Sequence, residues 1–483
     1  MRPNSEGPGR YGAGRRIRRR TRFVALIGAL AAAVLLAAGC SSSSSNGSSS
    51  ASSPAATASA AAATSGPASP AASAGPASDI GITPTTIKIG VIADVNNPLV
   101  PGLFKDSVSA VKAWADIVNA SGGLDGRKVA VDFCDSQLNP NTTTSCVIKA
   151  CQNDFALVGT SANALEDISD LDGCKDAAGK AVGLPNLAAF AFPPLSCDPD
   201  TYLANGLGPY CTTAKDNPQT YTVPVGDTRY FTSHNSGLHG IWLYDSDDPT
   251  FKITQTPLFK AQSNVGIKED GQGFYALSGA APQSALTPYI QQIKASGSTF
   301  VYVDVTTASM VLVRREAQLQ GANSVKVWLC NSGCYDPAFY QQGGATVNGT
   351  YASLYELPYL SDHTVNPALD KLVTQVGGVA NVNNNAVGSY IMALLFQDAV
   401  QKAVAKGAPL DRASVFAALN NDESSFTADG IIGPTNIGAR TGSNCQVLIQ
   451  LDSGVWQRVD PVKPGTLDCS SDNNVTIKMN TGS

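Results

Sequence analysis

Short apolar runs alternate with amphipathic segments along most of the chain after residue 80. Runs rich in β-branched residues predict buried strands, and apolar residues spaced three and four apart predict helices. We expect strands at 87–93, 128–134, 155–159, 181–189, 299–305, 325–330 and 349–356, and helices at 106–120, 141–154, 286–295, 308–321, 367–376, 386–405 and 412–419. Because strands and helices alternate, the predicted fold class is α/β, with doubly wound parallel sheets that are covered on both faces.

Three stretches depart from this alternation. Residues 193–226 are rich in Pro, Asn and Asp, and we interpret them as an elaborated loop before the chain crosses into a second lobe. Two apolar runs at 446–451 and 455–459 flank a turn and predict a terminal hairpin. Gly271, Gly273 and Ala276 match the dinucleotide motif GxGxxA, but no helical periodicity follows them, so we expect a loop there.

The first forty residues have the basic, apolar and small-residue order that is typical of a secretory signal. Residues 1–39 hold eight Arg and one acidic residue, and 23–38 form an apolar run of 16 residues. A bilayer crossing needs roughly 20 residues, so the run favours a signal peptide over a transmembrane anchor. The small residues before Cys40 resemble a bacterial lipobox, although Ala37 stands where Leu is usual. We expect a lipid on Cys40, with a secreted form as the alternative.

Residues 41–78 consist almost entirely of Ser, Ala, Pro, Gly and Thr, without a charged or aromatic side chain. Such a composition cannot bury a core, so we expect a disordered tether. A flexible chain of this length spans on the order of 35 Å. The tether would hold the folded body away from a membrane while keeping it attached.

Ten cysteines remain when Cys40 is set aside, and an even number predicts disulfides in an exported protein. Three local pairs are expected, Cys330 with Cys334, Cys197 with Cys211, and Cys445 with Cys469. The other four allow three connectivities, which stay open: Cys134, Cys146, Cys151 and Cys174. No CxxC spacing is present, so zinc is not expected.

The body is acidic and carries no recognisable catalytic motif. Residues 40–483 hold 25 basic and 37 acidic residues, which argues against nucleic-acid binding because that needs a basic surface. Neither GxSxG nor HExxH occurs, and the three His residues are scattered. The acidic run at 245–248 is typical of a turn at a strand end. We therefore expect a protein that is not an enzyme and needs no metal or cofactor.

Small and polar residues follow four of the predicted strands, at 160–163, 188–190, 306–307 and 331–333. Ligands of open α/β sheets bind outside the carboxyl ends of the strands. Exposed N–H, hydroxyl and amide groups at these positions suit a small polar ligand. Helix capping is the ordinary alternative for each segment alone.

A series of recognisable segments runs along residues 83–460. It begins at IKIGVIADVNNP and continues with NASGG at 119–123 and GRK at 126–128. It extends through FALVGTSANAL and STFVYVDVTTASMVLVRREAQLQGA to GIIGP at 430–434. In this order, the segments resemble the branched-chain amino-acid-binding family, the substrate-binding lipoproteins of ABC importers.

The resemblance implies a type I periplasmic-binding-protein fold with two lobes that close on a ligand and are joined by a three-stranded hinge. The implied organisation is a signal peptide at 1–39, a tether at 40–78, a first lobe at 79–225 plus 350–435, a second lobe at 226–349 plus 436–470, and a tail at 471–483. The implied ligand-binding residues are Phe104, Ser161, Ala162, Asn163, Ala188, Phe190, Thr306 and Ser332. Ser332 stands where the family has an ammonium-binding Glu, so Asp304 and Glu356 are candidates for the missing charge.

These expectations combine into one functional hypothesis. The chain is a monomeric lipoprotein, anchored outside the cytoplasm by Cys40, that delivers a small polar solute such as an amino acid or amide to an ABC permease. Lobe closure on the ligand is the expected mechanism. One alternative keeps the fold but makes the chain a ligand sensor without a transport role. Another is a structural or hydrolytic surface protein.

Overall fold

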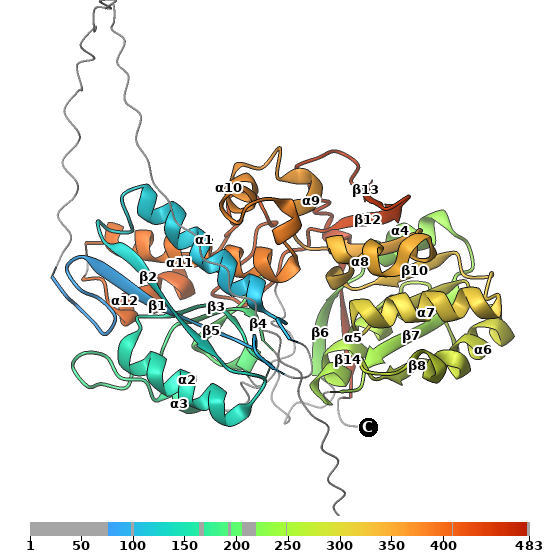
Figure 1. Ribbon diagram of the computed structural model, residues 1–483, viewed down its shortest axis with the longest axis horizontal. Coiled ribbons are helices and arrows are strands. Elements are labelled where there is room, and N and C mark those ends of the chain that lie inside the picture. The colour runs from blue at the N-terminus through green and yellow to red at the C-terminus, as the bar shows by residue number, and fades with distance from the viewer. Residues whose placement is uncertain are drawn as a thin grey trace, which may run out of the picture. The chain divides into compact units, whose positions relative to one another are not determined.

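The computed structural model describes seven stretches of the chain, and the signal, the tether and Cys40 lie outside them. The described residues are 76–97, 101–163, 169–191, 195–204, 219–247, 249–407 and 409–480. Two sheets with their helices make up most of this part (Figure 1).

The first sheet has five parallel strands in the order β2-β1-β3-β4-β5. Its strands are β1 (Thr86–Ala93), β2 (Lys128–Asp135), β3 (Leu157–Ser161), β4 (Asn186–Phe190) and β5 (Thr201–Tyr202). A separate apolar core lies on each face, as expected of a sheet that is covered on both sides. Helices α1 (Lys105–Ala120) and α11 (Asn384–Ala405) contribute to one core, and α2 (Pro140–Asn153) contributes to the other.

Aromatic packing joins α1 and α11, two helices far apart in sequence. Trp114 of α1 meets Phe396 of α11 edge-on at 6.1 Å between ring centroids, and the Trp114 indole donates to Gln397. Both helices contact the first sheet. The segment after residue 384 therefore returns to the first sheet. It also carries α12 (Arg412–Asn421), and α10 (Pro367–Gln375) contacts α1.

The second sheet has seven strands in the order β13-β12-β11-β10-β9-β7-β8. Its strands are β7 (His239–Asp245), β8 (Lys268–Leu277), β9 (Phe300–Asp304), β10 (Val327–Cys330), β11 (Thr350–Leu354), β12 (Val447–Asp452) and β13 (Val455–Asp460). The strands from β7 to β11 are parallel, and the terminal hairpin adds β12 and β13 in antiparallel pairing. Its helices are α4 (Gly226–His234), α5 (Pro249–Asn264), α6 (Thr287–Ser296), α7 (Thr307–Gln320) and α8 (Pro337–Gly343).

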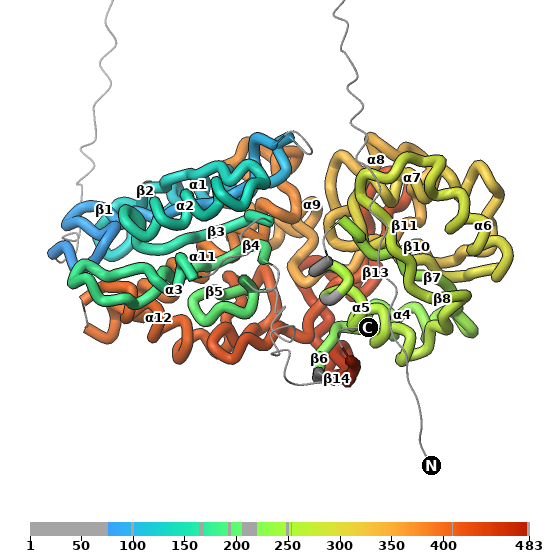
Figure 2. Tube along the Cα trace, turned by 90° about the horizontal axis from the view of Figure 1, so that it is seen from below, coloured from blue at the N-terminus to red at the C-terminus, as the bar shows by residue number. Residues whose placement is uncertain are grey.

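A third sheet pairs two segments that lie 250 residues apart. β6 (Gln219–Pro224) and β14 (Asn474–Met479) are antiparallel along their whole length and lie side by side in both views (Figure 1, Figure 2). Residues 471–483, which we expected to be a tail, therefore include a strand. Its formation has a packing reason, since Ile477 is buried in one cluster with Tyr221 and Val223.

Most predicted elements are confirmed within a few residues, but we did not predict the first helices and strands of the segment that forms the second sheet. α4, β7, α5 and α8 were not predicted, nor was the short α9 (Tyr359–Asp362). The expected loop at Gly271 and Gly273 is wrong, because β8 runs through it. The register of β7 against β8 shifts between Gly240 and Trp242, so residues 270–273 form a bulge in which both glycines have positive φ.

The disulfides resolve the connectivity that the sequence left open. Cys134 pairs with Cys146 and Cys151 pairs with Cys174. The predicted pairs Cys330–Cys334 and Cys445–Cys469 are confirmed. Cys197 is disulfide-bonded, and its expected partner, Cys211, lies outside the described residues.

Candidate functional site

Asp94 organises the carboxyl edge of the first sheet, where ligands of open α/β sheets bind. The residue follows β1 and its side chain has no exposed surface. Its carboxylate accepts hydrogen bonds from the Ser136 hydroxyl (2.6 Å), the Leu138 N–H (2.7 Å) and the Asn163 N–H (2.8 Å). One buried carboxylate thus ties together the segments that follow β1, β2 and β3.

Asp135 performs a similar task at the end of β2. Its carboxylate accepts from the backbone N–H groups of Val95 (3.0 Å), Asn96 (3.0 Å) and Gln137 (3.1 Å). Burial opposes ionisation of Asp135, but these hydrogen bonds outweigh it and lower its pKa. The loops at this edge are therefore held by charges that are satisfied within the protein.

The predicted residues at this edge begin with Ser161, the last residue of β3, and continue with Ala162 and Asn163. The Ser161 hydroxyl is buried and donates to Ser107 Oγ at 3.1 Å, and Ala162 is buried as well. Asn163 donates its N–H to Asp94, while its Oδ1 is buried without a hydrogen-bond partner in the described chain. Of the three side chains, the Asn163 amide has the most free hydrogen-bonding capacity.

The other predicted residues of the first sheet form an apolar surface beside this edge. Phe104, just before α1, and Phe190, at the end of β4, have ring centroids 5.6 Å apart. Phe104 is buried and Phe190 is half-buried. Ala188, two residues before Phe190, is fully buried and belongs to the core on the α2 face. The structure thus brings Phe104 and Phe190 together, whereas Ala188 packs into a different apolar core.

The second sheet has acidic side chains at its carboxyl edge. Asp245 ends β7 and Asp304 ends β9, and both are largely buried. A Cβ added to Gly279 would lie 2.8 Å from Thr306 Cγ2, 3.3 Å from Asp247 Oδ2 and 3.6 Å from Asp245 Oδ2, so these three side chains converge on one point. Burial raises the pKa of Asp304 to about 6, the hydrogen bond from Asn331 opposes the rise, and nearby Asp245 adds to it.

Thr306 and Asn331 complete this edge. Thr306 is exposed and caps α7, where its Oγ1 accepts from the Ser309 N–H at 3.0 Å. The Asn331 amide donates to Asp304 Oδ1 at 3.1 Å and accepts from the Gly333 N–H at 3.0 Å. Ser332 follows at a half-buried position inside the Cys330–Cys334 loop. Asn331, one residue before Ser332, is therefore the residue that contacts the acidic group.

Glu356 adds a third acidic residue, just after β11. Only 8% of the residue is exposed, and its Oε1 has no hydrogen-bond partner among the residues that the structure describes. Burial raises the pKa of Glu356 to about 7, although hydrogen bonds from its own and the Tyr355 backbone oppose the rise. Glu356 lies near Tyr359, whose hydroxyl donates to the Tyr335 carbonyl.

Together, the two edges offer complementary chemistry. The first sheet presents an aromatic pair and the Asn163 amide, and the second presents Asp245, Asp304 and Glu356. Sequence reasoning missed Asp94 and Asp245 as members of the site. The sequence did hold a signal, because Asp94 directly follows a predicted strand and Asp245 ends β7, which was not predicted. The residues that Asp94 contacts, however, lie far away in sequence.

A model of the family described as "Periplasmic binding protein" matches residues 86–175 and 259–454 of this chain, which is more than half of its length. The chain belongs to the periplasmic binding protein family. The match confirms the family that the sequence resembled. Curated protein sequences include no match to this periplasmic binding protein.

Solved structures support the same fold for this periplasmic binding protein. A fatty acid ABC transporter substrate-binding protein from Thermomonospora curvata has a TM-score of 0.60 at 16% identity, and the match covers 80% of this chain and 97% of that one. A leucine-binding protein from Thermotoga maritima has a TM-score of 0.56 at 14% identity, with 78% and 99% covered. The described part therefore has the type I periplasmic-binding-protein fold.

Family membership settles the general role of this periplasmic binding protein. It is an extracytoplasmic solute-binding protein, and it is not an enzyme. Within the described ranges, every helix is too short or too polar to cross a membrane.

Proposed function

We propose that the chain captures a small polar solute that carries a positively charged amino group and passes it to an ABC permease. The observation that carries this proposal is the pair of buried carboxyl groups, Asp304 and Glu356, at the carboxyl edge of the second sheet. Neither forms an ion pair with Lys or Arg in the described part of the chain. A buried carboxylate is costly unless a cation accompanies it, and a solute ammonium group is such a cation.

The first sheet supplies the rest of the recognition in this proposal. The rings of Phe104 and Phe190 offer an apolar surface, and the free Asn163 amide oxygen accepts one hydrogen bond from a polar group. Aromatic surface and a few oriented polar groups are typical of small-molecule sites. The solute therefore has a compact apolar part next to its polar groups, as an amino acid or an amino-amide does.

Capture works by lobe closure in this account. The proposed first lobe comprises 79–225 plus 350–435, and the second comprises 226–349 plus 436–470. Support comes from α11, which follows the second sheet's β11 in sequence but packs on β3 and β4 of the first sheet. A solute that contacts both edges binds the closed state more tightly than the open one, and this difference shifts the population toward closure.

Attachment to the membrane through a lipid on Cys40 is also part of the proposal. Its support is the sequence order of Arg-rich, apolar and small residues before Cys40. The test is a Cys40→Ala variant expressed in a bacterial host that processes lipoproteins. We expect wild-type protein in the membrane fraction and the variant outside it. Equal membrane recovery of both proteins would contradict the lipid anchor.

Thermal unfolding against a solute panel tests the solute class. The oxidised protein is stripped of bound ligand by unfolding and refolding, then heated with amino acids, amino-amides, polyamines, sugars and fatty acids. A solute at 100 times its Kd stabilises by about 2.7 kcal/mol, or a Tm rise of roughly 5–10 °C. We expect the rise only with amine-bearing solutes. A rise with fatty acids or sugars alone would overturn the proposed class.

A further inference from the structure

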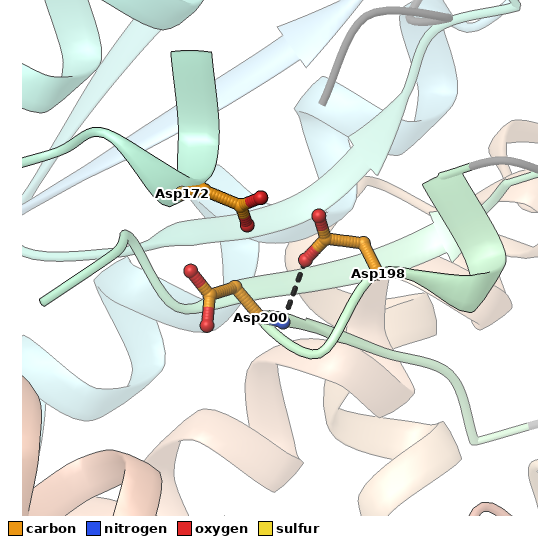
Figure 3. Close-up of side chains that lie close together, drawn as sticks. All are labelled: Asp172, Asp198 and Asp200. Carbon is orange, nitrogen blue, oxygen red and sulfur yellow. Dashed lines mark hydrogen bonds between the residues drawn. The ribbon is translucent and has the colours of Figure 1, made fainter. Parts of the chain in front are cut away.

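Three carboxylates gather beside the first sheet, away from its carboxyl-edge residues. Asp172 ends the short helix α3 (Ser169–Asp172), and Asp198 and Asp200 lie in the turn between the 3₁₀ helix at Leu195–Cys197 and β5. One oxygen from each carboxylate lies within 4.8 Å of the others (Figure 3). Asp172 is exposed, Asp200 is half-buried and Asp198 is completely buried.

Asp198 points an unsatisfied oxygen into this cluster. Its Oδ1 accepts from the Asp200 N–H at 2.6 Å, as the dashed line in Figure 3 marks. Its other oxygen, Oδ2, is buried and has no hydrogen-bond partner in the described stretches, and it faces the Asp172 carboxylate. A buried carboxylate oxygen without a partner, directed at a second carboxylate, is unfavourable unless something positive lies between them.

Positive charge from the protein is too distant to fill that place. Arg440 is the basic residue whose charge acts on Asp198 and Asp200, but its guanidinium lies over the Tyr202 ring at 5.8 Å. Its Nη1 contacts the Ser196 carbonyl at 3.5 Å. No ion pair joins Arg440 to the three carboxylates within the described residues.

Mutual repulsion gives the cluster a reason to bind a cation. The three carboxylates place an oxygen each within 4.8 Å of one another, and Asp198 is completely buried. A multivalent cation between them would offset this repulsion and would supply the partner that Asp198 Oδ2 lacks in the described stretches.

We propose that Asp172, Asp198 and Asp200 bind a calcium ion. The donors are all oxygen atoms, which suit a hard divalent cation, and Ca²⁺ accepts the irregular arrangement of 6–8 oxygens that a turn and a helix end can provide with water. Zinc prefers nitrogen and sulfur ligands, and the cysteines nearest in sequence, Cys174 and Cys197, are already disulfide-bonded. Extracellular Ca²⁺ sites have affinities of roughly 10⁻⁴–10⁻³ M, and an extracytoplasmic protein belongs to that class.

The ion has a structural task in this proposal. It joins α3 to the turn that precedes β5, and these two segments lie next to Cys174 and Cys197 in sequence. Gly183 leaves room for the Asp200 carboxylate, because a Cβ added there would lie 1.8 Å from Asp200 Oδ2. Its φ of +81° also favours glycine at this position. Calcium would therefore stabilise this side of the first sheet without contacting the residues of the proposed solute site.

The test is a calcium titration of the chelator-stripped, oxidised full-length protein, followed by calorimetry and by thermal unfolding at pH 7.5. We expect measurable Ca²⁺ binding heat and a Tm rise of about 3–11 °C at 10 mM CaCl₂. Both effects should disappear in Asp172→Asn and in Asp198→Asn. The matched control is Asp170→Asn, a neighbour on α3 outside the cluster, and it should respond as the wild type does.

Three results would overturn the proposal. The first is a wild-type protein that shows neither heat nor stabilisation up to 10 mM Ca²⁺, as expected if Asp172 and Asp198 share a proton instead. The second is binding heat and stabilisation with MgCl₂ but not with CaCl₂, which would show that the site binds magnesium and not calcium. The third is an undiminished response in Asp172→Asn. Because Asp172 is exposed, we expect this variant to fold as the wild type does.

Discussion

The two sheets end in carboxyl edges that use acidic residues in opposite ways. At the first edge, Asp94 and Asp135 are saturated by hydrogen bonds from the loops around them. At the second edge, Asp304 and Glu356 are buried with raised pKa values, and Glu356 keeps an oxygen without a partner in the described chain. The comparison teaches that a buried carboxylate can have two roles. One whose oxygens all accept hydrogen bonds from the protein holds the loops of the edge together, and one that keeps an oxygen without such a bond is available to a ligand.

Removing the satisfied carboxylate should have the largest effect. Asp94→Ala leaves the Ser136 hydroxyl and the Leu138 and Asn163 N–H groups without their acceptor, so we expect a loss of about 3–5 kcal/mol in the free energy of unfolding. Urea denaturation measures it. The control is Asp116→Ala on the exposed face of α1, which should change stability by less than about 0.5 kcal/mol. A loss below about 1 kcal/mol for Asp94→Ala would contradict its structural role.

Neutralising the second edge should weaken binding more than folding. Asp304→Asn removes the charge that we propose faces the solute ammonium, so we expect affinity for an amine-bearing solute to fall roughly 30- to 150-fold. Calorimetry measures it. Asp270→Asn is the matched control, because Asp270 pairs with His239 at the amino end of the same sheet. Equal affinity losses in the two variants would show that long-range charge, and not contact, governs binding.

Glu356 gives the ligand-free protein a pH dependence with a definite sign. Its pKa is raised from 4.5 to about 7, so the folded state binds more protons than the unfolded state between these values. The stability that Glu356 contributes is therefore present below pH 4.5 and declines as pH rises to about 7. Glu356→Gln should remove this decline, which makes the variant roughly 3 kcal/mol more stable than wild type at pH 8 and similar to it near pH 4.5. Unfolding curves at both pH values check this, and a variant less stable at pH 8 would contradict it.

The smallest expected effect concerns the cap of α7. Thr306→Val keeps the shape of the side chain but removes the oxygen that accepts from Ser309, so we expect a loss of about 1 kcal/mol. Thr306→Ser keeps this oxygen and serves as the control, with a loss of less than half that value. If the two variants are equally destabilised, the cap is not what Thr306 contributes.

Much of the fold could be predicted because its strands are apolar runs and most of its helices have regular periodicity. α5 was missed because Pro257 interrupts a segment that is rich in Thr and Gln. β8 was missed because its four-residue bulge has the composition of a loop. The β14 strand depends on pairing with β6, which lies 250 residues away and which no local pattern shows.

The site was predictable only where it follows strand ends. The prediction that Ser161, Asn163, Thr306 and Ser332 lie at the carboxyl edges follows from strand positions, and their place in the structure agrees with it. Their chemical roles could not be read in the same way. Asp94 forms hydrogen bonds with residues that lie 42, 44 and 69 positions away in sequence. The contact with Asp304 is made by Asn331, which is one residue before the predicted Ser332.

The central claim is that the second edge recognises a positive charge on the solute. Calorimetry with one amine-bearing solute from the thermal panel and its N-acetylated analogue tests this claim most directly, in the wild type and in Asp304→Asn. This double cycle isolates the coupling between the amino group and the carboxylate. We predict that the wild type binds the amine at least 30-fold more tightly than the analogue and that the variant loses most of this preference. Equal binding of both solutes by the wild type, or an unchanged preference in the variant, would contradict the account.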